Sequence, residues 1–174
     1  AQAGAVLRPP YVLKAVSPQI VHKSEFGAVK IGLESIAAVE AALETMQAAL
    51  TARGIGSCRW LVEEMAPAGI ECVIGGIMDP EFGPMVMVGL GGVFVEIMGD
   101  VAFRICPIER IDAEEMVGEL RGLPLLQGAR GRAPVCIDAL VDALLKLGGE
   151  GGALMRYAGE VSEIDINPLI VTRD

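Results

Sequence analysis

The segment Glu163-Ile-Asp-Ile-Asn-Pro168 alternates oxygen-bearing and apolar side chains near the end of the sequence. We predict that it lies in a strand from about Glu160 to Val171, where successive side chains point to opposite faces. This alternation places Glu163, Asp165 and Asn167 on one face, and the two isoleucines between them on the other, where we expect them to be buried. Carboxylate and amide oxygens in this arrangement are hard ligands that suit Mg²⁺. The alternative is a solvated edge strand that ends at the proline.

The rest of the chain mixes short strands and helices without a strict strand–helix–strand alternation. Period-two and period-3.6 patterns, together with capping signals, predict these elements. The expected strands are Tyr11–Lys14, Ala28–Leu33, Arg59–Met65, Ile70–Ile77 paired with Pro84–Leu90, and Val93–Ile97 paired with Val101–Ile105. The expected helices run from a cap at Ser35 to about Ala52, from a cap at Asp112 to about Leu120, and from Ile137 to Leu147. This order favours an α+β protein rather than a doubly wound sheet, with a lobe boundary near Met65.

The composition limits the function classes. The chain has 174 residues, a formal net charge of −9 and 52% hydrophobic residues, of which few are aromatic. An acidic chain without a basic cluster is unlike a nucleic-acid-binding protein, so an anionic ligand would need local cations or Mg²⁺. The four cysteines are widely spaced and there is one histidine, which favours buried free thiols over a zinc site. We see no leader peptide and no membrane span, and we expect a cytoplasmic protein.

Several further residues are candidates for binding, and each has a simpler alternative. Lys14 ends an apolar strand, where a cation could meet phosphate oxygens or merely lie at the surface. His22 is in a polar loop and by itself reads as a surface residue. The acidic residues Glu63, Glu64 and Glu71 could bind ribose hydroxyls or simply be exposed.

The glycine-rich segment Gly89-Leu-Gly-Gly92 precedes a strand-like stretch rather than a helix, which excludes a Rossmann fingerprint. A tight turn and a backbone contact to phosphate both remain open for it.

A set of motifs in a fixed order covers nearly the whole chain, from Tyr11 to Val171. They are Val12-Leu-Lys14, Ser17-Pro-x-Ile-x-His-Lys-Ser24, Glu64-Met65 followed by Gly69-Ile-Glu71, Asp79-Pro-x-Phe-Gly-Pro84, Gly89-Leu-Gly-Gly92, Leu125-Leu-x-Gly-x-Arg-Gly131 and Asp165-Ile-Asn-Pro-Leu169. Together they resemble the ATP-grasp portion of NDP-forming (ADP-forming) acyl-CoA synthetases, relatives of the succinyl-CoA synthetase β chain. The resemblance implies an ATP-grasp fold with two small mixed lobes around a nucleotide cleft. We expect residues 1–64 to form the first lobe and residues 65–174 the second.

The same resemblance implies roles for individual residues. Lys14 corresponds to a lysine that contacts nucleotide phosphates, and Glu71 to an acidic residue near the ribose. The hinge that holds adenine corresponds to Glu63, Glu64, Met65 and Ala66.

For the chemistry, Asn167 corresponds to a Mg²⁺ ligand, and Asp165 to a carboxylate near the metal and a phosphohistidine. His22 corresponds to a histidine proposed to relay phosphate at the nucleotide site.

The implied activity is that of an acid–CoA ligase (ADP-forming), with the overall reaction acyl-CoA + Pi + ADP ⇌ carboxylate + CoA + ATP. This chain would bind ATP or ADP with Mg²⁺ and pass phosphoryl between the nucleotide and a phosphohistidine. Its partner would be a CoA-binding domain or α subunit that carries a second phosphorylated histidine. The sequence has Gly27-Ala28 where the family usually has two glycines, and it ends before a further acidic metal ligand. Two alternatives are a regulatory ATP-grasp-like module of a protein lysine acetyltransferase and a degenerate fragment that needs a partner chain.

Overall fold

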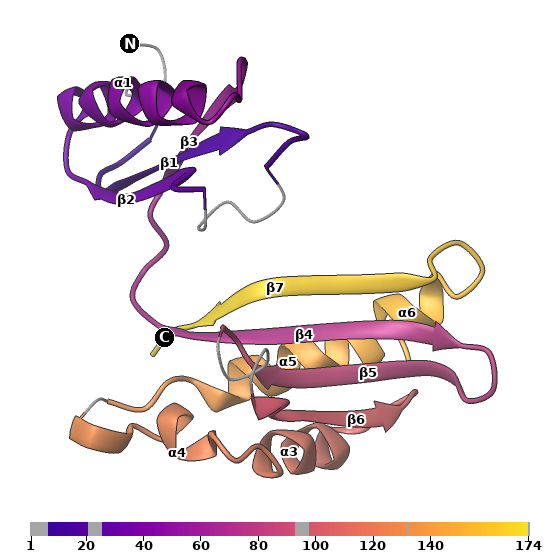
Figure 1. The fold of residues 1–174 in the computed structure, drawn as a ribbon. Coiled ribbons are helices and arrows are strands. Elements are labelled where there is room, and N and C mark those ends of the chain that lie inside the picture. The colour runs from indigo at the N-terminus through magenta and orange to yellow at the C-terminus, as the bar shows by residue number, and fades with distance from the viewer. Residues whose placement is uncertain (1–6, 21–25, 93–97, 132, 174) are drawn as a thin grey trace. The chain divides into compact units, whose positions relative to one another are not determined.

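The computed structural model describes residues 7–20, 26–92, 98–131 and 133–173. The chain divides into two compact units, residues 1–66 and residues 67–174. Unit 1 has a three-stranded sheet and one long helix. Unit 2 has a four-stranded sheet and several helices (Figure 1).

The sheet of unit 1 is antiparallel, with strand order β2-β1-β3. Its strands are β1 (Tyr11–Val16), β2 (Val29–Leu33) and β3 (Arg59–Glu64). Alternate residues of β1, namely Tyr11, Leu13 and Ala15, are buried in apolar clusters that also contain side chains of helix α1 (Ile36–Ala52). The other face of β1 carries Lys14, which is half-buried.

Helix α1 begins and ends where the sequence predicts. The hydroxyl oxygen of Ser35 accepts a hydrogen bond of 3.2 Å from the backbone N–H of Ala38, which satisfies one of the free N–H groups of the first turn. The chain leaves the helix at Gly54, whose φ of +82° lies in the left-handed region that glycine adopts without strain. Val39, Met46 and Leu50 form its buried stripe.

The sheet of unit 2 is also antiparallel, with strand order β6-β5-β4-β7. Its strands are β4 (Ile70–Asp79), β5 (Gly83–Leu90), β6 (Val101–Ile105) and β7 (Glu163–Val171). The helices among its described residues are α3 (Arg110–Gly118), α4 (Leu123–Leu126), the 3-10 turn η2 (Ala129–Gly131), α5 (Ile137–Gly148) and α6 (Ala153–Arg156).

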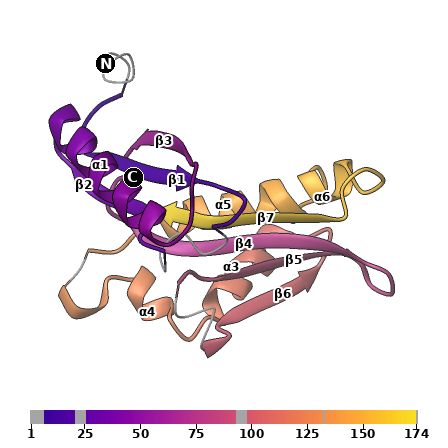
Figure 2. The same ribbon diagram turned by 45° about the horizontal axis from the view of Figure 1, so that its top comes forward.

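One face of this sheet packs against the helices, and α5 and α6 lie behind it in Figure 1. Ile74 and Val86 point from the sheet into the main core, where they join Met116 of α3, Leu144 of α5 and Leu154 of α6. The same arrangement, turned, is seen in Figure 2. None of the helices named above, which lie in the described part of unit 2, covers the opposite face, and we refer to it as the open face.

One expectation about unit 2 is revised and another falls outside the described residues. Helix α3 starts two residues before Asp112 and is capped by Glu109. Asp112 is the third residue of the helix, and its carboxylate accepts a 2.7 Å hydrogen bond from the backbone N–H of Glu109. The predicted cap at Asp112 is therefore wrong, because the capping box joins Glu109 and Asp112. Strand β6 pairs with β5, whereas the expected partner strand 93–97 lies outside the described residues.

A buried carboxylate fixes the connection between α3 and α4. Asp100 is 4% exposed, and its two oxygens accept 2.8 Å hydrogen bonds from the backbone N–H groups of Arg121 and Gly122. A buried carboxylate is costly unless such donors satisfy it. Asp100 therefore has a structural role, which is to hold the chain at Arg121 and Gly122.

The thiols of Cys72 and Cys106 are buried, and burial raises the pKa of each to about 11. The thiolate is the reactive form, so both should resist iodoacetamide at pH 8 in the folded protein. The partly exposed Cys58 and Cys136 provide the internal control. Labelling of Cys72 as fast as that of Cys58, measured by mass spectrometry, would contradict the packing.

Because the raised pKa of these two thiols belongs to the folded state, the free energy of unfolding should fall as the pH rises from about 9 towards 11.

In the described part of the chain no helix combines the length and the apolar character that a membrane crossing requires.

Candidate functional site

Lys14 and Glu63 meet on the face of the unit 1 sheet that points away from α1. Strand register pairs Val12 with Glu63 and Lys14 with Leu61, which places the two charged side chains diagonally across neighbouring strands. The Nζ atom of Lys14 lies 2.5 Å from Oε2 of Glu63, and the two side chains are 34% and 40% exposed. Such half-exposed pairs contribute little to stability, so the contact mainly holds the ammonium group in position.

The predicted hinge residues lie at the end of β3 and immediately after it. The backbone N–H of Met65 donates to the carbonyl oxygen of Pro10 at 2.8 Å, and a carboxylate oxygen of Glu64 accepts from the backbone N–H of Arg8 at 2.7 Å. Both bonds tie the end of β3 to the chain before β1. Ala66, the last residue of unit 1, is exposed.

Glu71 lies near the start of β4, and its backbone explains part of the glycine-rich segment. The backbone N–H of Gly91 donates to the carbonyl oxygen of Glu71 at 2.7 Å. A Cβ atom on Gly91 would lie 3.0 Å from the backbone and Cβ of Glu71. Close approach of two chain segments therefore favours glycine at position 91, a packing role that the sequence did not predict. The side chain of Glu71 is exposed.

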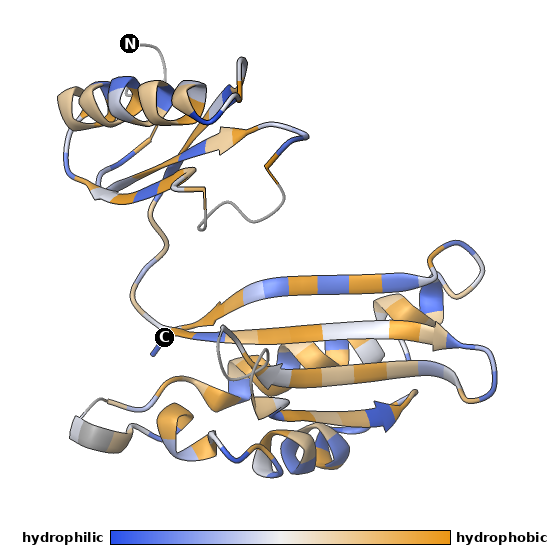
Figure 3. Cartoon of the chain, viewed as in Figure 1, coloured by the Kyte–Doolittle hydropathy of each residue, from blue (hydrophilic) through white to orange (hydrophobic). Residues whose placement is uncertain are grey.

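Strand β7 carries the alternating segment with the predicted phase. Asp165 pairs with Gly75 of β4, and Ile164 pairs with Gly76. Because they are consecutive residues of a strand, Asp165 and Ile164 point to opposite faces of the sheet. Ile164 packs against the main core, whereas Asp165 is exposed on the open face. The alternation of polar and apolar residues along β7 is visible in Figure 3.

The expected burial of both isoleucines is wrong for Ile166. It faces the same side as Ile74, its partner in the ladder, but its side chain is 38% exposed. The reason is that β7 is an edge strand of the sheet, so an inward-facing side chain there has neighbours on one side only. The alternative prediction of a solvated edge strand is therefore correct in part. β7 is an edge strand of the sheet, but its Ile164 packs against the core.

Asn167 lies where the pairing of β4 and β7 changes register. Cys72 faces Leu169 and Ile74 faces Ile166, so β7 has one more residue than β4 between these pairs. Such bulges re-aim side chains locally. Asn167 and Asp165 are both exposed near this point.

The donor set on β7 fits a hard divalent cation with few protein ligands. No group of three or more His, Cys, Asp or Glu residues that could hold a metal occurs among the residues with described positions. Mg²⁺ commonly keeps several waters and is held by one or two carboxylates plus substrate phosphates. A carboxylate and an amide oxygen, both open to solvent, are compatible with that mode.

His22, with Lys23 and Ser24, lies outside the described residues.

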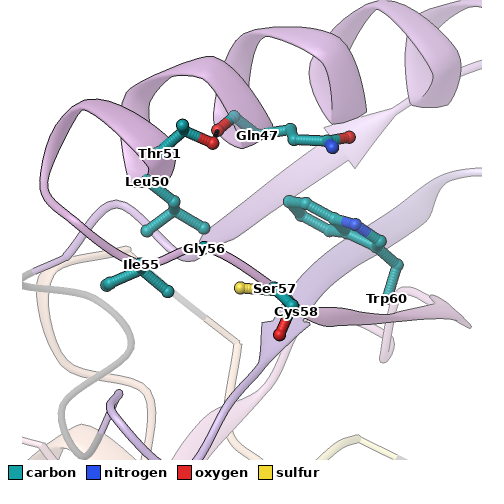
Figure 4. Close-up of a pocket in the computed structure, with 8 residues that line it drawn as sticks. All are labelled: Gln47, Leu50, Thr51, Ile55, Gly56, Ser57, Cys58 and Trp60. Carbon is teal, nitrogen blue, oxygen red and sulfur yellow. Dashed lines mark hydrogen bonds between the residues drawn. The ribbon is translucent and has the colours of Figure 1, made fainter.

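A pocket of about 180 Å³ in unit 1 was not predicted from the sequence. It lies between the last turns of α1, the loop that follows and β3 (Figure 4). Its lining residues are Gln47, Leu50, Thr51, Ile55, Gly56, Ser57, Cys58 and Trp60. None of the predicted site residues is among them.

A second unanticipated pocket lies on the open face of unit 2, beside Asp165. It holds about 160 Å³ and brings Asp165 together with Met87 and Phe103. No sequence motif singled out Met87 or Phe103. Their relation to Asp165 follows from strand order, because β7, β4, β5 and β6 are adjacent in the sheet.

Known proteins resemble this chain over nearly its full length. The sequence pattern described as the ATP-grasp domain matches residues 1–174. The β subunit of acetate–CoA ligase (ADP-forming) I from Pyrococcus furiosus is 44% identical over 167 residues, which are 95% of this chain and 70% of that one. Acetate–CoA ligase (ADP-forming) I from Archaeoglobus fulgidus is 40% identical over 168 residues, 93% of this chain but 23% of that protein.

Solved structures are also similar to this chain. The dinucleotide forming acetyl-coenzyme A synthetase 1 of Ca. Korarchaeum cryptofilum, in complex with coenzyme A, Ca-AMPCP and HgCl+, matches with a TM-score of 0.84 and 41% identity, over 99% of this chain and 75% of that chain. Another structure of that protein contains coenzyme A and Mg-AMPPCP, with its phosphohistidine segment pointing towards the nucleotide binding site. That match has a TM-score of 0.80 and 41% identity, over 99% of this chain and 74% of that chain.

The present fold combines helices with antiparallel sheets, and it superposes on the synthetase structure with a TM-score of 0.84. This chain belongs to the ATP-grasp family. The predicted ATP-grasp fold and the resemblance to ADP-forming acyl-CoA synthetases are confirmed.

Proposed function

We propose that this chain is the nucleotide-binding part of an ADP-forming acid–CoA ligase. The observation that carries the proposal is the exposed pair Asp165 and Asn167 on β7, in a chain 44% identical to the β subunit of such a ligase. Phosphoryl would pass between ADP or ATP and a phosphohistidine of a CoA-binding partner, within the reaction acyl-CoA + Pi + ADP ⇌ carboxylate + CoA + ATP. The relatives named above are ligases, which favours this function over the regulatory module of an acetyltransferase.

The binding roles are assigned residue by residue. Lys14, held beside Glu63, would contact phosphate oxygens, and the segment from Glu63 through Glu64 and Met65 to Ala66 would hold adenine. The exposed carboxylate of Glu71 would accept hydrogen bonds from the ribose. Residues 1–64 and 65–174 would be the two lobes that contribute these groups.

The catalytic roles concern β7 and one loop. Asn167 and Asp165 would hold Mg²⁺, which when bound offsets charge on the phosphoryl group. Asp165 would also orient the partner's histidine, and His22 would relay phosphate at the nucleotide site. An acidic protein with a net charge of −9 repels a free nucleotide, and the metal offsets part of that repulsion. A chain without a described membrane-spanning helix is compatible with the cytoplasm, where ADP and CoA are found.

Calorimetry of ADP binding with and without Mg²⁺ tests the proposal. Mg²⁺ should strengthen binding to the unmodified chain, and Asn167→Ala should remove most of that gain, a loss of at least about tenfold. Lys14→Met should weaken binding both with and without metal, because it removes a charge from the phosphates. The matched control is Lys146→Met, an exposed lysine in the last turn of α5. Equal Mg²⁺ dependence in the unmodified chain and Asn167→Ala would refute the metal assignment.

A further inference from the structure

The pocket of about 180 Å³ in unit 1 has an apolar floor that the end of helix α1 holds in place. The backbone N–H of Ile55 donates to the carbonyl oxygen of Leu50 at 3.0 Å, and that of Gly54 donates to the carbonyl oxygen of Thr51 at 2.9 Å. This pair of bonds closes the last turn and brings the apolar side chains on either side of it into contact. Leu50 and Ile55 are both buried, so the floor is preformed.

Trp60 of β3 forms the opposite wall, and Figure 4 shows its indole ring across the pocket from Leu50 and Ile55. Trp60 pairs with the buried Ala15 of β1 and packs against the apolar clusters that contain side chains of α1. The next residue, Leu61, pairs with Lys14 and points to the other face of the sheet. The pocket and the predicted phosphate-binding lysine therefore lie on opposite faces of the unit 1 sheet.

Polar groups line the side of the pocket formed by α1. Gln47 and Thr51 are four residues apart, which places them on the same face of the helix. The Oγ1 atom of Thr51 donates to the backbone carbonyl oxygen of Gln47 at 2.8 Å, so this oxygen keeps its capacity to accept. The side-chain amide of Gln47 has no hydrogen bond to another residue that the structure describes. It therefore presents both an acceptor and donors to a ligand.

The lining selects the charge and the size of a ligand. None of the eight lining residues is charged, so an ion that entered would lose hydration without gaining a counter-ion. An indole wall favours contact with another aromatic ring, and the amide of Gln47 is complementary to a second amide. An engineered cavity of about 150 Å³ binds benzene. The present pocket therefore has room for one ring with one small substituent.

We propose that this pocket binds an uncharged aromatic carboxamide with a single ring. The ring lies between the indole of Trp60 and the aliphatic side chains of the floor, and the amide exchanges hydrogen bonds with Gln47. This is a second ligand site, because none of the residues assigned to the nucleotide lines it. It stands whether or not the chain acts as part of a ligase.

Trp60 is the only tryptophan in the chain, so its fluorescence reports directly on the pocket. Benzamide is the probe, and it should change this fluorescence with half-saturation at about millimolar concentration, as expected for so small a ligand. Benzoate has the same ring but carries a charge, and cyclohexanecarboxamide has the same amide on a ring without a π system. Each should bind about fivefold or more weakly than benzamide.

A variant and a second readout test the contacts one by one. Gln47→Leu removes the amide at an exposed helical position and keeps a good helix former, so the fold is retained. It should weaken benzamide binding about fivefold or more. Gln127→Leu makes the same change at an exposed residue after α4 and should leave binding unchanged.

The second readout is labelling by iodoacetamide, followed by mass spectrometry. Saturating benzamide should slow the labelling of Cys58 about fivefold, because this thiol lines the pocket and the thiol must be reached to react. Cys136, which is also partly exposed but lies in unit 2, should be labelled at the same rate with and without benzamide.

The outcomes decide the assignment. Benzamide that leaves the fluorescence of Trp60 unchanged, or that fails to protect Cys58, overturns the site. Binding of benzoate as tight as that of benzamide, or equal affinity in Gln47→Leu and the unmodified chain, overturns the class of ligand. Because the experiments contain no nucleotide and no partner subunit, a failure of the proposed ligase function leaves their results unchanged.

Discussion

Replacement of Leu144 by alanine should lower the free energy of unfolding of unit 2 by about 3 kcal/mol. Leu144 has no exposed surface and lies in the core cluster shared by α5 and the sheet. Its truncation removes apolar area from a closely packed interior and leaves a cavity that its neighbours fill only in part. Urea unfolding followed by far-UV circular dichroism measures the loss.

Leu145→Ala is the matched control. It makes the same chemical change in the next residue of α5, but Leu145 is half-exposed and lies at the margin of the core. Its expected cost is about 1 kcal/mol, since part of its surface is already in contact with water. Equal losses for the two variants would mean that α5 presents a different face to the sheet.

Sequence periodicity predicted those elements whose signals are local. The cap at Ser35, the extent of α1 and the pairing of β4 with β5 all agree with the structure. Each depends on residues a few positions apart in the chain, where propensity and spacing determine the conformation. The start of α3 shows the limit, because Glu109 is an uncommon capping residue and the pattern favoured Asp112 instead.

Other features depend on neighbours that are distant in sequence. Alternation gave the phase of β7, but whether Ile166 is covered depends on the position of β7 at the sheet edge. The approach of Lys14 to Glu63 depends on the register between β1 and β3. The pocket beside Asp165 requires four strands in one order, and Phe103 belongs to a strand 58 to 70 residues away from β7 in the chain. No local pattern carries that information.

The four-strand order also separates two kinds of residue on one face. Carboxylates lie on β7, where Glu163 and Asp165 are exposed, and large apolar side chains lie on β6, where Phe103 and Ile105 are exposed. The carboxylates would act on a phosphoryl group only through the metal that offsets its charge. Because they are exposed, the sheet presents them without burying an unpaired charge.

Asp165→Asn should slow phosphoryl transfer between phosphohistidine and ADP by about 100-fold or more, because an amide neither carries the charge nor accepts as two carboxylate oxygens do. Affinity for Mg·ADP should change less, since Asn167 and Lys14 remain. Folding should be unaffected, because Asp165 is exposed on the open face. The measurement is rapid-quench transfer from the phosphorylated partner subunit to ADP, with binding followed separately by calorimetry.

Glu81→Gln is the control for Asp165→Asn, because Glu81 is an exposed carboxylate of unit 2 in the turn between β4 and β5. It removes the same charge from the unit without changing β7, so transfer should keep its normal rate. A general effect of net charge would slow both variants alike by weakening the long-range field of the protein. Slowing confined to Asp165→Asn assigns the effect to the carboxylate on β7. Transfer at full rate in Asp165→Asn would remove this residue from the mechanism and leave Asn167 as the only β7 residue with a proposed role in catalysis.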